Sequence, residues 1–214
     1  MILDTIGIPA SRPGRKIAIW AVSLVLMSIA CWIGFQSDPH LADENHLMEN
    51  AQAAALLLAC LIHGWRASKL ERGSVAFLLH SGLSLLMYSF FLRELEIREL
   101  DAPGQHFWAW TEHTVRAIGW SLWVVYLVYF AKHIRRVWAA RRALLATPVI
   151  LCALCAAVFM AAGWPFDKEK FASVSPANSA FMEEILELNG YLILLAGSAS
   201  ASLEEGENKK RRRA

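Results

Sequence analysis

Carboxylates and arginines beside apolar segments are the residues of this sequence with the most capacity for chemistry. Most of them stand where three apolar segments begin, and within each of these groups two members are three or four positions apart, whereas Arg93 and Glu94 stand where another apolar segment ends. Because helix residues at those spacings share a face, each group would present its polar side chains together. We therefore predict one polar pocket, built from Glu49, Gln52, Arg93, Glu94, Glu112, His113, Arg116, Glu183, Glu184 and Glu187.

A purely structural explanation accounts for part of this pattern. A helix N-terminus stabilises a nearby carboxylate by about 0.3–1 kcal/mol without any further role, and this is enough to explain Glu49, Glu112 or Glu183 taken singly. It explains Gln52 and Glu187 less well, because the effect fades within the first turn. Carboxylates held in low dielectric need a proton, an arginine or a cation, which keeps a functional pocket open as a hypothesis.

The charged block FLRELEIREL, residues 91–100, places Arg93 at the edge of the same region. If the preceding helix continues, Glu94 and Arg98 stand at i, i+4 in the favourable order and Arg93 is within reach of Glu96. The block then partly neutralises itself as an interfacial helix. Arg93 is also one of few arginines near the excess of carboxylates.

A metal centre is the first chemistry that these residues suggest. His113 with Glu112, Glu49, Glu183 or Glu187 would supply the mixed nitrogen and oxygen ligands that a divalent zinc, manganese or iron ion accepts. A metal-activated water would suit hydrolysis of a lipid-like substrate. The spacing signal is weak, because no HExxH pattern occurs and the ligands would come from separate helices.

Proton- or cation-coupled transport is a second chemistry. An acidic vestibule could bind a cationic substrate and exchange protons through Glu187 or Glu49. Few polar residues continue such a path toward the other side, and the obvious ones are His63, His80 and Ser81.

Haem binding is a third chemistry, since His63 and His80 fall at comparable depth in neighbouring apolar segments. Two imidazoles from two helices are enough for axial ligation. A lone membrane histidine is more often a hydrogen-bonded packing residue.

The favoured hypothesis is a membrane subunit or assembly component without enzymatic activity, whose polar outer face meets another membrane protein. The sequence contains no Walker loop, no Rossmann glycine pattern and no G-x-S-x-G.

The elements that must position these residues are helices of membrane length. The chain is 56% hydrophobic and 19% charged, below the roughly 25% charge of an average soluble domain. Residues 17–35, 74–92 and 143–163 are secure spans of about 20 residues. Residues 47–65, 111–131 and 181–201 reach that length only with their polar first turns included.

Basic residues decide the orientation. Sixteen fall in residues 1–16, in the connections after the second and fourth spans and in the tail, whereas four fall in the other connections. The positive-inside bias then places both termini in the cytoplasm.

The prediction is an all-α, multi-pass protein of the bacterial cytoplasmic membrane, with six helices in a single domain over 17–201. A cytoplasmic segment over 1–16 precedes it, and a disordered basic tail over 202–214 follows. The expected partners are the lipid bilayer and other membrane proteins; no nucleic acid is expected, because topology already explains the basic tail.

Overall fold

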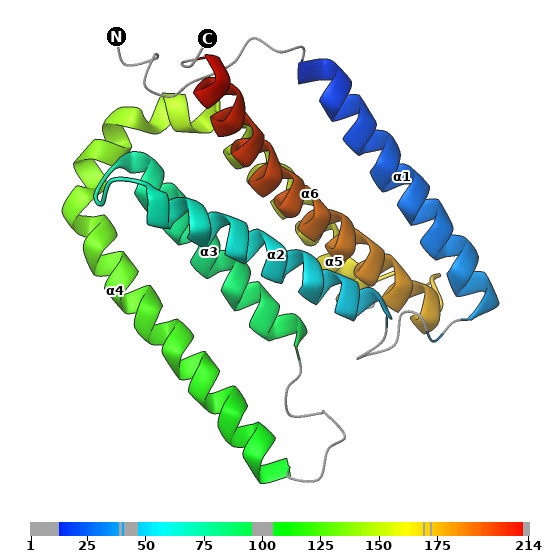
Figure 1. Cartoon of the computed structure of the whole chain (residues 1–214). Helices are drawn as coiled ribbons and strands as arrows, with labels where there is room; N and C mark the ends of the chain where they lie inside the picture. The colour runs from blue at the N-terminus through cyan, green and yellow to red at the C-terminus, as the bar shows by residue number, and fades with distance from the viewer. Residues whose placement is uncertain are drawn as a thin grey trace. The chain divides into compact units, whose positions relative to one another are not determined.

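The computed structural model describes residues 13–38, 40, 47–95, 105–168, 170–171 and 173–211, with side chains outside residues 13–18, 105–106 and 201–211. Over these residues the chain forms six α-helices and no strand, which confirms the all-α prediction (Figure 1). The helices are α1 (Pro13–Ser37), α2 (Leu47–Lys69), α3 (Val75–Glu94), α4 (Gln105–Leu145), α5 (Pro148–Asp167) and α6 (Pro176–Arg211).

Five of the described helices are long and apolar enough to cross a membrane, which supports a multi-pass membrane protein. The candidate spans lie in α1 to α5: Ile19–Ser37, Leu47–Lys69, Val75–Glu94, Phe107–Leu145 and Pro148–Asp167. The sixth helix carries Glu183, Glu184 and Glu187 near its start, and these charges lower its hydropathy. A sixth span and the orientation of the termini stay predictions.

The helix ends in the middle of the chain follow from capping chemistry. The Ser74 side chain accepts a hydrogen bond from the Phe77 amide at 3.1 Å and so starts α3. Gly73 just before it has φ +83°, a conformation that side chains disfavour, so the tight α2–α3 turn depends on glycine. Thr147 caps α5 in the same way, with Pro148 in its first turn.

Helix α4 is much longer than the predicted span over 111–131. It begins at Gln105 and ends at Leu145, which is 41 residues. The basic stretch after residue 131 was expected to be a connection, but it contains no proline or glycine, and arginine, lysine, alanine and leucine all favour helix. The helix therefore continues until the turn before Pro148, and α5 begins later than the expected residue 143.

Helix α6 is also longer than expected. It begins at Pro176, ahead of the predicted residue 181, and its backbone remains helical to Arg211. The tail over 202–214 was expected to be disordered; residues 202–211 are helical instead, and residues 212–214 lie outside the described part. Glu96 and Arg98 of the charged block lie outside it as well.

The chain divides into two compact units. Unit 1 comprises Met1–Glu49 and Ala143–Ala214, and unit 2 comprises Asn50–Arg142. The single transmembrane domain over 17–201 stays a prediction. Unit 1 thus contains α1, α5 and α6, whereas unit 2 contains α3 with most of α2 and α4.

In unit 1 the described part of α6 packs closely against α5, as Figure 1 shows. Gly197 lies over Cys152, and a Cβ added at Gly197 would come within 2.8 Å of the Cys152 Cβ. Gly190 similarly lies over Ala156, whose carbonyl oxygen would be 3.3 Å from an added Cβ. Small residues at a membrane helix contact let the backbones approach closely. At one end of the unit, Phe35, Met48, Phe181, Ile185 and Leu188 form a buried apolar cluster.

In unit 2 the contact between α3 and α4 contains side-chain hydrogen bonds from one helix to the other. The Tyr88 hydroxyl donates to the Val115 carbonyl at 3.0 Å, and the Tyr126 hydroxyl donates to the Leu78 carbonyl at 3.1 Å. The Trp123 indole donates to the Ser89 hydroxyl at 2.8 Å. These bonds fix which face of α4 is turned toward α3.

Candidate functional site

Arg93 and Glu94 form an ion pair at the end of α3. The Arg93 Nε and Glu94 Oε1 atoms are 2.9 Å apart. The Glu94 side chain is 5% exposed and that of Arg93 is 52% exposed, so the carboxylate is buried while the guanidinium reaches outward. This neighbouring guanidinium balances the charge of a carboxylate that would otherwise be costly to bury.

Glu112 and Arg116 form a second ion pair one turn apart on α4. The Arg116 Nε and Glu112 Oε1 atoms are 3.0 Å apart, and the Glu112 side chain is 11% exposed. The i, i+4 spacing recognised in the sequence therefore corresponds to a direct contact. His113 is exposed on the neighbouring surface of the same helix.

The other predicted pocket residues are divided between the two units. Gln52 is fully buried in unit 2. In unit 1 Glu187 is 7% exposed and lies against α5, where its Cγ is 3.8 Å from the position that a Gly163 Cβ would take. Glu49, Glu183 and Glu184, also in unit 1, are half-buried. The convergence of all these residues in one pocket stays a prediction.

The metal hypothesis is divided in the same way. Glu49 and Glu187 belong to unit 1, whereas Glu112 and His113 belong to unit 2. Among the residues that the structure describes, no group of three or more histidine, cysteine, aspartate or glutamate side chains is arranged to hold a metal ion. A divalent metal bound by these four residues stays a prediction.

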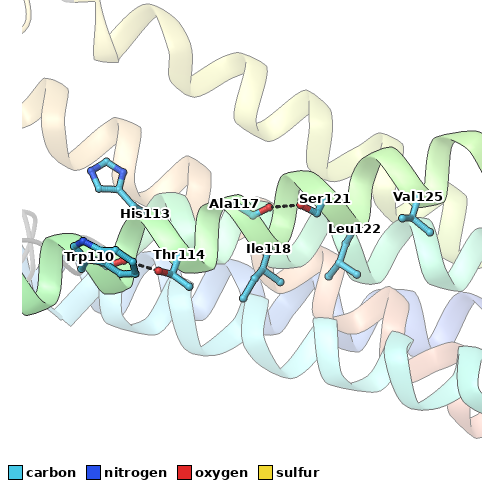
Figure 2. Close-up of a pocket in the computed structure, with 8 residues that line it drawn as sticks. All are labelled: Trp110, His113, Thr114, Ala117, Ile118, Ser121, Leu122 and Val125. Atoms are coloured by element: carbon cyan, nitrogen blue, oxygen red, sulfur yellow. Dashed lines mark hydrogen bonds between the residues drawn. The ribbon is translucent and has the colours of Figure 1, made fainter.

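A groove of about 500 Å³ runs along the exposed face of α4 (Figure 2). Thr114 and Ser121 lie in it, and their hydroxyls donate to carbonyls of their own helix, at Trp110 and Ala117, both at 2.8 Å. The polar atoms are thus satisfied within α4 and leave an apolar surface. The lining residues are Trp110, His113, Thr114, Ala117, Ile118, Ser121, Leu122 and Val125.

His63, His80 and Arg66 form a buried polar cluster between α2 and α3. The Nδ1 atoms of His63 and His80 are 2.8 Å apart, and Arg66 Nη1 is 3.3 Å from His80 Nε2. All three residues are below one tenth exposed, at 2%, 7% and 8% for His63, His80 and Arg66. The sequence predicts the two histidines at one depth, whereas Arg66 is counted there only among the basic residues that set the orientation. Its spacing of three residues from His63 was the available signal.

The direct contact between the two histidines does not leave room for an iron between them. An iron between two imidazoles needs one free nitrogen lone pair from each ring facing it. Here His63 Nδ1 and His80 Nδ1 face each other in a direct hydrogen bond, so the rings would have to turn apart to hold an iron. Haem ligation by His63 and His80 stays a prediction that requires such a rearrangement.

Unit 1 contains a buried side-chain amide that was not among the residues predicted from the sequence. Asn189, which is 5% exposed, donates to the Ser28 hydroxyl of α1 at 3.0 Å and to the Ile185 carbonyl at 2.7 Å. Its position in the middle of an apolar segment was a usable signal, because a polar side chain there needs a partner.

Comparison with known proteins finds no matching family model, no matching curated protein and no matching solved structure. Function is therefore argued from the residues themselves.

Proposed function

We propose that this chain is a non-enzymatic subunit or assembly component of the bacterial cytoplasmic membrane, with both termini in the cytoplasm, and that the groove on α4 receives a transmembrane helix of a partner protein. The observation that carries this proposal is the face on which the groove lies.

The groove lies on the side of α4 that is turned away from α3. Val115, Trp123 and Tyr126 make the hydrogen bonds to α3, and at 100° per residue Thr114, Ala117 and Ser121 fall on the opposite side. One side of α4 thus makes hydrogen bonds to α3 within unit 2, and the opposite side carries the groove.

The chemistry of the groove suits a second helix. Ala117 and Ser121 are small residues at i, i+4, the spacing that lets two membrane helices approach closely. Larger side chains such as Ile118 and Leu122 form one wall and would interdigitate with the side chains of a partner. In the predicted orientation, His113 and the Glu112–Arg116 ion pair stand at the outer end, where they offer hydrogen bonds to a polar partner surface.

Native membranes provide the test. Ala117→Trp fills the groove, so a detergent-solubilised complex should shift to the size of the free protein on native electrophoresis. Leu127→Trp is the matched control, because Leu127 is 54% exposed on the same helix but does not line the groove. The proposal fails if the wild-type chain already migrates alone, or if Ala117→Trp leaves a larger complex intact. Mass spectrometry of the larger band distinguishes another protein from a second copy.

Metal analysis and an absorption spectrum separate this proposal from the enzyme and haem hypotheses. A subunit without a cofactor should purify with no stoichiometric metal and no Soret band. A metal that disappears in His113→Ala or Glu49→Ala would favour a metal-dependent hydrolase. A Soret band that disappears in His80→Ala would favour haem binding.

Proton-coupled transport is a second candidate, favoured by the buried cluster of His63, Arg66 and His80. Such a cluster is costly in a membrane protein and lies on the proposed proton path. Purified protein in vesicles with an imposed proton gradient should then dissipate the gradient faster than protein-free vesicles, and His63→Ala should slow this flux. Equal rates with and without protein would remove this candidate.

A further inference from the structure

The hydrogen bonds of the cluster have only one consistent direction. A guanidinium is a donor with no acceptor atom, so in the contact between Arg66 and His80 the His80 Nε2 must accept. A neutral imidazole carries one proton, and His80 therefore carries it on Nδ1. That proton is donated to His63 Nδ1, which lies 2.8 Å away. His63 in turn must carry its own proton on Nε2.

An additional proton on the histidine pair changes these hydrogen bonds. The two neutral rings have two nitrogens without a proton, namely His80 Nε2 and His63 Nδ1. Each of them is already an acceptor, the first from Arg66 and the second from His80. A third proton on either nitrogen removes an acceptor and breaks one of the two hydrogen bonds. On His80 it also places two cationic groups in contact.

We propose that His63, His80 and Arg66 form a proton-binding site, in which uptake of one proton breaks one of the two hydrogen bonds that join α2 and α3 at this level. The inference goes beyond the proposed role of the α4 groove and does not depend on it. In the predicted orientation, the site lies in the half of the hairpin near the cytoplasm.

The neighbouring groups leave this pair as the titrating element of the hairpin. On α2 they are Arg66 and Cys60, and on α3 they are Ser81 and Ser84, which have no charge. On α4 the nearby titratable side chains approach other residues: Tyr126 lies at Gly82, and Tyr129 and His133 lie at Gly73.

A contact one turn further along would hold the hairpin when the pair opens. The Ser84 hydroxyl donates to the Cys60 carbonyl at 3.0 Å, and neither group gains a proton on acidification. Opening at His63 and His80 can therefore be local, with Ser84 as the point about which the cytoplasmic end loosens.

Nitrogen NMR on the full-length protein in lipid bilayers, labelled with ¹⁵N in histidine, tests the site directly. At neutral pH we expect His80 as the Nδ1–H tautomer and His63 as the Nε2–H tautomer, with a nitrogen–nitrogen coupling across the bond between them. Acidification should add one proton to the pair and remove one of the two hydrogen bonds. A proton on His63 Nδ1 abolishes the coupling, whereas a proton on His80 Nε2 keeps the coupling and removes the contact with Arg66. The opposite tautomers, or both hydrogen bonds persisting after protonation, would overturn the proposal.

Substitution of the arginine provides an independent readout. Arg66→Met removes both the competing donor and a positive charge, so the pH midpoint of proton uptake should rise by about one to two units. Arg136→Met is the control, because Arg136 donates to the Gly73 carbonyl rather than to the pair, and its midpoint should match the wild type. Equal midpoints in Arg66→Met and wild type would contradict the site. His80→Asn replaces the imidazole with an amide that cannot titrate, so proton uptake should fall to that of His63 alone while the protein remains folded.

Discussion

In unit 1 the contact between α5 and α6 is made by small residues, whereas in unit 2 the contact between α3 and α4 contains hydrogen bonds between side chains. Gly190 and Gly197 bring α6 against the backbone of α5. Tyr88, Trp123 and Tyr126 reach across from one helix of unit 2 to the other. Both arrangements are used where lipid provides no hydrophobic driving force between helices.

The two kinds of helix contact differ in how they respond when the helices move apart. A close glycine contact stores its stabilising energy in many small dispersion contacts, which are lost together when the helices separate. A hydrogen bond can break and re-form singly. The histidine pair, which can respond to one proton, accordingly lies in the unit with hydrogen-bonded contacts.

The largest expected effect comes from filling the glycine contact of unit 1. Gly197→Ala places a Cβ 2.8 Å from the Cys152 Cβ, so one helix must move. We expect the free energy of unfolding to fall by about 1–3 kcal/mol, as for overpacked cores. The measurement is SDS-induced unfolding in mixed micelles. Gly163→Ala is the control, because its added Cβ meets nothing closer than 3.7 Å, and stability should be kept. Equal losses in both variants would mean that close approach is not what matters.

The next effect comes from removing hydrogen bonds of unit 2. Tyr126→Phe and Trp123→Phe should each lower the free energy of unfolding by about 0.6 kcal/mol, and at most about 1.7 kcal/mol, the range for such bonds in membrane proteins. Ser121→Ala is the control, because its hydroxyl bonds to its own helix at Ala117. A loss in Ser121→Ala as large as in Tyr126→Phe would contradict the assignment of stability to bonds between helices.

Unit 1 also contains a hydrogen-bonded link between helices, made by Asn189, so its stability need not depend on small residues alone. Asn189→Leu removes the bond to Ser28 and should cost about 0.6–1.7 kcal/mol in the same unfolding experiment. Ser28→Ala should cost less, because the Asn189 amide keeps its bond to the Ile185 carbonyl. If Asn189→Leu is as damaging as Gly197→Ala, unit 1 depends on this polar link as much as on its glycines.

The smallest effect should come from the ion pair on α4. Arg116 is about half exposed, and exposed i, i+4 pairs contribute about 0.3–0.5 kcal/mol. Arg116→Gln should therefore change the free energy of unfolding by no more than this, and less in high salt. A loss above about 1 kcal/mol would show that the buried Glu112 depends on Arg116 more strongly than its exposure implies.

Much of the fold could be predicted because apolar length and capping residues are local properties. The run over 74–92 gives α3 almost to the residue, since Ser74 and the glycine before it mark its start. The end of α4 could not be predicted from hydropathy, because its basic extension is polar yet strongly helix-forming. The length of a helix and the length of its membrane span are different properties, and an apolar window predicts only the span.

The candidate site was predictable only in part. Glu112 and Arg116 pair because their spacing is set by a single helix. The contact between His63 and His80 depends on how α2 and α3 are aligned, and no spacing within one segment fixes that alignment. The close approach at Gly197 also depends on a second helix, so a glycine in an apolar run did not reveal it.

The length of α4 limits how this helix can move. At 1.5 Å per residue its 41 residues extend about 60 Å, roughly twice the thickness of the hydrocarbon core. In the predicted orientation the surplus at the cytoplasmic end carries Lys132, Arg135, Arg136, Arg141 and Arg142, which resist entry into lipid. A piston-like displacement of α4 toward the outside is therefore blocked. Tilting of α4 together with α3 remains as its low-energy motion, because the hydrogen bonds to α3 oppose rotation of α4 about its own axis.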